Sequence, residues 1–98
     1  GDEVEIQLKL EGDKVKEYTW TGVGCAISQA SADMLGDLVA DLPLNDALNL
    51  TKKEIYEMLG IEISLRRSKC ALLGLLALQN GILLNQKKEK RSWTNYHV

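Results

Sequence analysis

The sequence is poor in the residues that many catalytic and nucleic-acid-binding sites need. It has one histidine and two cysteines in 98 residues, and its formal net charge is −2. A serine or cysteine hydrolase needs a histidine beside its nucleophile, and the lone His97 lies in a terminal stretch without such an arrangement. A slightly negative charge offers no electrostatic footprint for nucleic acid or for an anionic membrane. These absences argue against a hydrolase and against binding to nucleic acid or membranes.

The sequence also lacks a long apolar run and a phosphate-binding glycine motif. Its most apolar stretch, residues 70–84, is interrupted by glycine and amide residues and is shorter than the roughly 20 residues that cross a bilayer. The glycines match neither dinucleotide-binding nor P-loop spacing. The chain opens on a strand pattern rather than a signal peptide, so we expect a cytoplasmic protein. Its two cysteines could form one disulfide, but in that compartment a pair of thiols is expected.

The sequence does contain enough apolar residues, 45% of the total, for the core of one globular domain. Its first residues have the pattern of a β-hairpin. Apolar residues alternate with polar ones near the start, as in a half-buried strand: Val4, Ile6, Leu8 and Leu10. Residues 11–13 supply turn chemistry, which predicts an antiparallel return strand over 14–21. Within it, Val15 falls on one parity and Tyr18 and Trp20 on the other, which indicates a bulge near Lys16 and Glu17.

The rest of the chain reads mainly as helices. Apolar positions at helical spacing predict a helix over 26–40 that ends before Pro43, and Asn45 is placed to cap a short turn through residue 50. A capping box, Thr51 to Glu54, predicts a helix that Gly60 terminates. Residues 61–65 are predicted as an extended connection, and the leucine-rich segment 70–86 as the central core helix. Because a hairpin alone is marginally stable in water, these helices should cover its apolar face, giving an α+β fold.

The final residues differ in composition from everything before them. Residues 87–91 are charged, and 92–98 show no periodicity although they include Trp93, Tyr96 and His97. We therefore expect a folded domain over residues 1–86 and a charged, flexible C-terminal tail over 87–98.

The two cysteines occupy similar settings. Cys25 follows glycine-rich residues 22–24 and directly precedes a predicted helix, and Cys70 follows a polar segment and begins another. Backbone N–H groups and the helix dipole favour a thiolate at such a position, so the pKa of Cys25 should fall. The two thiols could meet at one end of the domain as part of a metal site, with Asp2 as an oxygen donor. Two unrelated structural thiols are an equally open alternative, and His97 is not expected to be a ligand.

Several motifs resemble those of a known family. They are Gly1-Asp2 before the alternating strand, Gly24-Cys25-Ala26-Ile27-Ser28-Gln29-Ala30-Ser31-Ala32, Leu44-Asn45-Asp46-Ala47 and Arg67-Ser68-Lys69-Cys70. In content, order and spacing they resemble the NifU/IscU/SufU family of iron–sulfur cluster assembly scaffolds, over residues 1–84. The resemblance implies a SufE/NifU-like α+β sandwich, in which a small antiparallel sheet carries helices on one face and the ligands gather at one exposed end.

The resemblance also implies roles for particular residues. Asp2, Cys25 and Cys70 match ligands of an iron–sulfur cluster of the 2Fe–2S type or of zinc, and the two cysteines are candidate persulfide acceptors. The family's first ligand cysteine would stand immediately before Gly1, so we expect the chain to be truncated at its N-terminus. Lys69 and Arg67 are expected to act on the thiolates electrostatically. The implied partners are a cysteine desulfurase and apo-proteins that receive the cluster.

Three functions follow as hypotheses. The first is a scaffold, not an enzyme, on which an iron–sulfur cluster is assembled from iron and persulfide sulfur and then passed to apo-proteins. The second is a zinc-binding, SufU-like sulfurtransferase that accepts persulfide from a cysteine desulfurase. The third is a degenerate interaction module without a metal site. Lys69 before Cys70 resembles the SufU branch, whereas the spacing between Cys25 and Cys70 is closer to the IscU branch.

Overall fold

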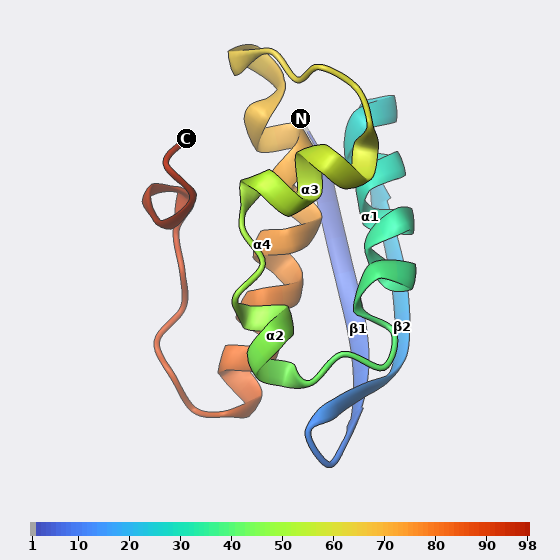
Figure 1. Cartoon of the computed structure of the whole chain (residues 1–98), viewed down its shortest axis with the longest axis vertical. Helices are drawn as coiled ribbons and strands as arrows, with labels where there is room; N and C mark the ends of the chain where they lie inside the picture. Colours follow the sequence, from blue (N-terminus) through green and yellow to red (C-terminus); the bar gives the residue numbers. More distant parts are fainter. Residues whose placement is uncertain (1) are drawn as a thin grey trace.

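The computed structural model describes residues 2–98; Gly1, the first residue of the Gly-Asp motif, lies outside the described residues. The chain begins with an antiparallel hairpin of β1 (Glu3–Glu11) and β2 (Lys14–Val23), shown in blue in Figure 1. Gly12 closes the turn in a left-handed conformation with φ of 62°, where glycine is favoured because it has no Cβ. The register pairs Glu3 with Val23, so the start of β1 lies beside the end of β2.

The predicted bulge is confirmed. Lys9 pairs with Glu17 and Leu10 pairs with Val15, which leaves Lys16 as the extra residue on β2. The extra residue changes the parity of the strand, so Val15, on one side of it, and Tyr18, on the other, can both face the core. Lys16 lies in solvent and forms an ion pair with Glu11 at 2.9 Å.

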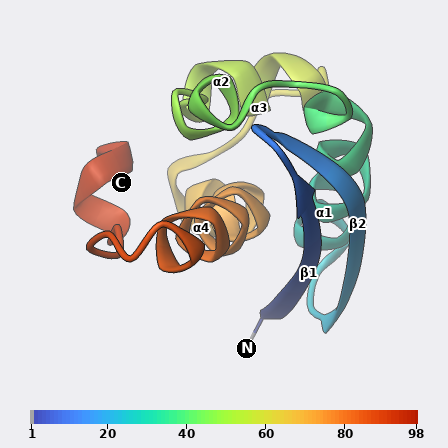
Figure 2. The same cartoon turned by 90° about the horizontal axis from the view of Figure 1, so that it is seen from below.

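The helices cover the apolar face of the hairpin, as predicted. Within residues 2–98 they are α1 (Ala26–Val39), α2 (Leu44–Leu48), α3 (Lys52–Leu59) and α4 (Ser68–Asn85), with short 3₁₀ turns η1 (Leu65–Arg67) and η2 (Trp93–Tyr96). Figure 2 shows α4 beside β1 and α1 beside β2. At the top of that view, α3 contacts both α1 and α4, and α2 contacts α4. The core is formed largely by leucines of α4 together with Leu35 and Val39 of α1 and Ile55 of α3. The α+β prediction is confirmed.

Most helix boundaries follow the sequence signals. The last helix begins at Ser68, two residues before the predicted start at Cys70, and Leu65, predicted as extended, begins the turn η1. The start of α2 also differs. Thr51 and Glu54 form the predicted capping box of α3, and Gly60 ends that helix with φ of 67°. Asn45 was predicted to cap the short turn, and this is wrong because it lies inside α2, where Pro43 occupies the N-cap position. The backbone N–H of Leu44 donates to Asp13 O at 2.6 Å, so contact with the hairpin turn sets where this helix starts.

A buried glutamine joins α4 to the segments that pack around it. Gln79 is 0% exposed, and its Nε2 donates to the carbonyl oxygens of Ala47 and Leu50 at 3.0 Å. Its Oε1 accepts hydrogen bonds from Arg91 Nη1 at 2.7 Å and from the hydroxyl of Tyr96, which is 4% exposed. Residues 91–96 therefore contact the α4 side of the fold (Figure 1). The division at residue 86 and the flexibility of 87–98 stay predictions.

The described helices show no candidate for a membrane span. Within residues 2–98, none combines the length and the apolar character that crossing a bilayer requires.

Candidate metal centre

The hairpin register places the carboxylate of Asp2 beside the end of β2. Because Glu3 pairs with Val23, the residue before Glu3 reaches the residues that follow Val23. The backbone N–H of Cys25 donates to Asp2 Oδ1 at 3.0 Å. Asp2 is thereby held against the start of α1, although 22 residues separate it from Cys25 in the chain.

Gly24 permits this close approach. An ideal Cβ built on Gly24 would lie 2.6 Å from Asp2 Oδ1 and 2.7 Å from Ser28 Oγ, closer than non-bonded atoms tolerate. The side chain of Gln29 donates to the Gly24 carbonyl at 2.9 Å and fixes this peptide further. Gly22 has a steric reason too, because a Cβ there would lie 2.2 Å from the backbone oxygen of Glu3, so both glycines that mark the motif before Cys25 are sterically required.

The packing of α1 on α4 brings the two thiols together. Cys25 is the N-cap residue of α1, and Cys70 lies in the first turn of α4. The helices approach closely where Gly74 faces Ala32, since an added Cβ on Gly74 would lie 3.3 Å from Ala32 Cα. Ser31 Oγ also donates to the carbonyl of Ala71 at 2.6 Å, one residue beyond Cys70.

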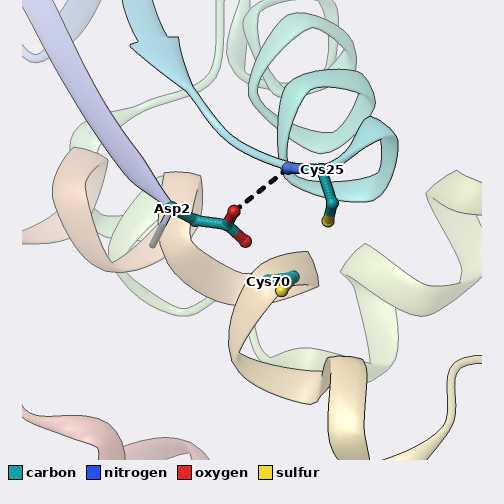
Figure 3. A group of neighbouring side chains, drawn as sticks. All are labelled: Asp2, Cys25 and Cys70. Atoms are coloured by element: carbon teal, nitrogen blue, oxygen red, sulfur yellow. Dashed lines mark hydrogen bonds between the residues drawn. The ribbon is translucent and has the colours of Figure 1, made fainter.

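The three candidate ligands converge at one end of the fold. One ligand atom each from Asp2, Cys25 and Cys70 lies within 4.8 Å of the others, and all three residues are partly exposed. Figure 3 shows their side chains directed toward a common space between the start of β1 and the N-terminal ends of α1 and α4. Both cysteines are free thiols. The convergence that the sequence pattern left open, and that the family resemblance implied, is present in the fold. The role of these residues as ligands or persulfide acceptors stays a prediction.

Hydrogen bonds give the two cysteines different pKa values in the metal-free protein. The backbone N–H of Ser28 at the start of α1 lowers the pKa of Cys25, helped by the Ser28 hydroxyl, which confirms the predicted direction. A hydrogen bond to the Asp2 carboxylate, followed by desolvation, raises the pKa of Cys70 to about 12. The same Cys70 bond and the Cys25 N–H lower the pKa of Asp2. Cys25 is thus the readier thiolate, and Asp2 holds the proton on Cys70.

The donor set fits a thiophilic metal. Thiolates and carboxylates are ligands of zinc, and zinc–sulfur bonds of about 2.3 Å in a tetrahedral site place two sulfurs roughly 3.8 Å apart. The mutual spacing within 4.8 Å is near that value, so small side-chain rotations would bring the three atoms onto one ion. Binding would displace the proton from Cys70, because metal ligation requires the thiolate. A tetrahedral ion keeps one further position for another donor.

The remaining predicted site residues lie around this centre and not in it. Arg67 precedes α4 as its N-cap residue and is exposed. Lys69 is exposed too, and its Nζ lies 6.0 Å from the centroid of the Trp93 ring, within the range of a cation–π contact. The electrostatic role proposed for both residues stays a prediction. His97 lies just beyond η2 and does not belong to the ligand group of the described residues.

Two features of the site were not predicted from the sequence. Ser28, which the sequence marks only as part of the motif after Cys25, is fully buried with its hydroxyl against Cys25. Its position three residues after the N-cap cysteine is a local signal, since the third helical residue folds back onto the N-cap. The contact of Lys69 with Trp93 has no such signal, because it depends on how the C-terminal residues fold back.

The chain is thus an α+β domain in which a carboxylate before β1 meets two thiols at the N-terminal ends of α1 and α4, a donor set that suits a metal ion. Residues 1–92 match the NifU-like N terminal domain family, and the chain belongs to that family. The recognition of the NifU/IscU/SufU scaffold family from the sequence is thus confirmed.

Individual relatives agree with this assignment. The chain is 29% identical to the zinc-dependent sulfurtransferase SufU of Bacillus subtilis, over 84% of this chain and 67% of that protein. It is 34% identical to the iron–sulfur cluster assembly scaffold protein IscU of Aquifex aeolicus, over 79% of this chain and 48% of that protein. A crystal structure of a hypothetical protein has the same fold, with a TM-score of 0.70 and 27% sequence identity. The match covers 84% of this chain and 73% of that protein. The chain spans about half to two thirds of the length of these curated relatives.

Proposed function

We propose that this protein is a scaffold on which an iron–sulfur cluster is assembled from iron and persulfide sulfur and then passed to apo-proteins. The observation that carries the proposal is the convergence of Asp2, Cys25 and Cys70 within 4.8 Å at one partly exposed end of the fold. Thiolates are the ligands of iron–sulfur clusters. A carboxylate oxygen is a harder and weaker partner for iron than a thiolate, which suits cargo that must leave again.

The chain's own residues suggest how sulfur would arrive. The Cys25 sulfur, held as the readier thiolate by the N-terminus of α1, would attack the outer sulfur of a persulfide on a cysteine desulfurase. The sulfur–sulfur bond of that persulfide breaks, the desulfurase cysteine leaves as a thiolate, and Cys25 carries the persulfide. Cys70 lies close enough to take part as a second acceptor or as a ligand, once its proton has been released to solvent.

The test is anaerobic reconstitution of the full chain with ferrous iron, cysteine, a cysteine desulfurase and a thiol reductant, which reduces the persulfide sulfur to sulfide. We expect a visible-region chromophore with sulfide and iron bound, and its loss in Cys25→Ala, Cys70→Ala and Asp2→Ala. Asp46→Ala, which removes an exposed carboxylate in α2, is the matched control and should reconstitute normally. Transfer of the chromophore to an apo-ferredoxin checks the delivery step.

A second candidate is a zinc-binding sulfurtransferase that accepts persulfide from a cysteine desulfurase. It is supported by the similarity to zinc-dependent SufU and by the compactness of the ligand group, which suits one ion. Bound zinc would hold the thiolates in place and make them sulfur acceptors of lowered basicity. One zinc per chain, without a visible chromophore after reconstitution, would exclude the scaffold function and support this one.

A third candidate is an interaction module that keeps the fold without a functional metal site. Metal binding that is unimpaired in both Cys25→Ala and Cys70→Ala would argue against the two metal functions and favour this one. The three outcomes are distinguished by metal analysis and absorption spectra of the same set of variants.

A further inference from the structure

Ser28 is a buried polar residue in direct contact with one candidate ligand. Its side chain is 0% exposed, although serine is mostly found at protein surfaces. Its Oγ donates to the Cys25 carbonyl at 3.0 Å and lies 3.7 Å from Cys25 Sγ. A hydroxyl has one donor hydrogen and two acceptor lone pairs. Ser28 can therefore donate to the carbonyl while it accepts from the Cys25 thiol, or rotate about its C–O bond and donate to the Cys25 thiolate.

The same hydroxyl lies close to a second candidate ligand. The point where a Cβ on Gly24 would lie is 2.7 Å from Ser28 Oγ and 2.6 Å from Asp2 Oδ1. Both oxygens therefore border the same small space above Gly24, beside the N–H of Cys25 that donates to Asp2. Ser28 Oγ thus lies close to both the carboxylate and the sulfur, on a side chain that is fully buried.

We propose that Ser28 is a positioning residue of this centre: its hydroxyl fixes the orientation of the Cys25 sulfur relative to Asp2. The inference rests on the proposed function, in which Asp2, Cys25 and Cys70 hold the metal or cluster. Groups that hydrogen-bond to metal ligands orient those ligands, and removing them typically costs 10–100-fold in metal affinity. Ser28 has this relation to Cys25, whose side chain extends from a helix N-cap into partly open space.

A purely structural role would be different in its consequences. Ser28 also satisfies the carbonyl at the start of α1, so its loss would cost stability whether or not the sulfur is held. Ser31 provides the matched control on the same helix. It is equally buried, and its hydroxyl is committed to Ala71 O at 2.6 Å. Ser28→Ala and Ser31→Ala each remove one buried hydroxyl, but only the first removes one that contacts a ligand sulfur.

The first experiment measures zinc affinity by competition with a chromophoric chelator, together with the spectrum of the cobalt(II) form. Ser28→Ala should bind zinc roughly 10–100-fold more weakly and shift the sulfur-to-cobalt charge-transfer band. Ser31→Ala removes a bond between α1 and α4 without touching the sulfur, so it should lose less zinc affinity than Ser28→Ala and keep an unchanged band. Equal losses in both variants, or an unchanged affinity in Ser28→Ala, would overturn the proposal.

The second experiment needs no metal and so separates this proposal from the function on which it rests. Three-bond NMR couplings of the metal-free protein report the χ1 rotamer of Cys25. We expect one rotamer in the unaltered protein and in Ser31→Ala, and rotamer averaging in Ser28→Ala. If the unaltered protein binds neither zinc nor iron, the metal function fails while the couplings still decide whether Ser28 positions the sulfur. A single Cys25 rotamer in Ser28→Ala would contradict the positioning role.

Discussion

The absence of a side chain at Gly24 lets the Asp2 carboxylate reach the backbone N–H of Cys25. A Cβ at this position would meet Asp2 Oδ1 at 2.6 Å and Ser28 Oγ at 2.7 Å. We predict that Gly24→Ala displaces Asp2 and weakens zinc or cluster binding at least tenfold, measured by chelator competition. Gly60→Ala is the control, because Gly60 has φ of 67° but open space around it. It should lower the free energy of unfolding by about 1 kcal/mol and leave metal binding unchanged.

The two thiols should also differ in reactivity when no metal is bound. The pKa of Cys25 lies below its ordinary value and that of Cys70 is raised to about 12, while both side chains are partly exposed. At pH 8 iodoacetamide should therefore modify Cys25 first, because the thiolate is the nucleophile, and Cys70 should stay slow until the pH approaches 12. Peptide mass spectrometry of quenched samples measures both rates.

The carboxylate provides the control for this difference. Asp2→Asn removes the negative acceptor that holds the proton on Cys70, so the pKa of Cys70 should fall and its alkylation at pH 8 should accelerate. Faster modification of Cys70 than of Cys25 in the unaltered protein would contradict the assigned protonation states.

At the scale of elements, the distance between the thiols depends on the packing of α1 on α4. Gly74 and Gly81 lie on α4 and differ in what an added methyl would meet: the backbone at Ala32 Cα, 3.3 Å away, and the flexible side chain of Leu8, at 3.4 Å. We predict that Gly81→Ala stabilises the protein by about 0.5–1 kcal/mol through helix propensity. Gly74→Ala should be less stable than Gly81→Ala by roughly 1 kcal/mol or more, because backbone yields less readily than a side chain.

Metal binding separates the same two variants. Only Gly74→Ala pushes α1 away from α4, so only this variant should weaken zinc binding, while Gly81→Ala should match the unaltered protein. Urea unfolding and chelator competition give the two quantities. Equal behaviour of the two variants would show that the α1–α4 distance does not control the site.

Most elements were predictable because their signals are local. Alternation in β1, the parity change around Lys16, the capping box at Thr51 and the stop at Gly60 each depend on neighbouring residues. The start of α2 could not be predicted in this way, because it depends on the hydrogen bond from the Leu44 N–H to Asp13 O, between residues 31 positions apart. The site divides in the same way. The position of each cysteine at a helix start is a local signal. The contact of Asp2 with Cys25 depends on the hairpin register, and the family resemblance was the stronger reason to expect Asp2 in the site.

At the scale of the whole molecule, Gln79 joins α4 to two other segments of the chain, residues 47–50 and residues 91–96. Gln79→Ala removes its bonds to Ala47, Leu50, Arg91 and Tyr96 and leaves buried polar groups without partners. We predict a loss of about 3 kcal/mol in the free energy of unfolding, since each unsatisfied buried group costs about 1–3 kcal/mol.

The rate of tryptic cleavage near the C-terminus tests whether Gln79 holds Arg91 and Tyr96 in place. Cleavage after residues 87–91 should be at least tenfold faster in Gln79→Ala, because Arg91 and Tyr96 lose their anchor. Gln7→Ala, on the exposed face of β1, is the control and should change stability by less than about 0.5 kcal/mol. Unchanged cleavage in Gln79→Ala would instead support the proposed flexible tail over 87–98.

The three donors of the centre come from the first residues of the hairpin, the start of α1 and the start of α4, and only the folded chain brings them together. A bound ion would therefore act as a reversible cross-link between distant parts of the chain, one that the unfolded chain does not have. At a free ligand concentration a hundred times the dissociation constant, such binding stabilises the fold by about 2.7 kcal/mol. On the proposed function, handing over the cargo removes that cross-link. The emptied protein would then be the form that unfolds and is degraded more readily, which ties the lifetime of each molecule to whether it is loaded.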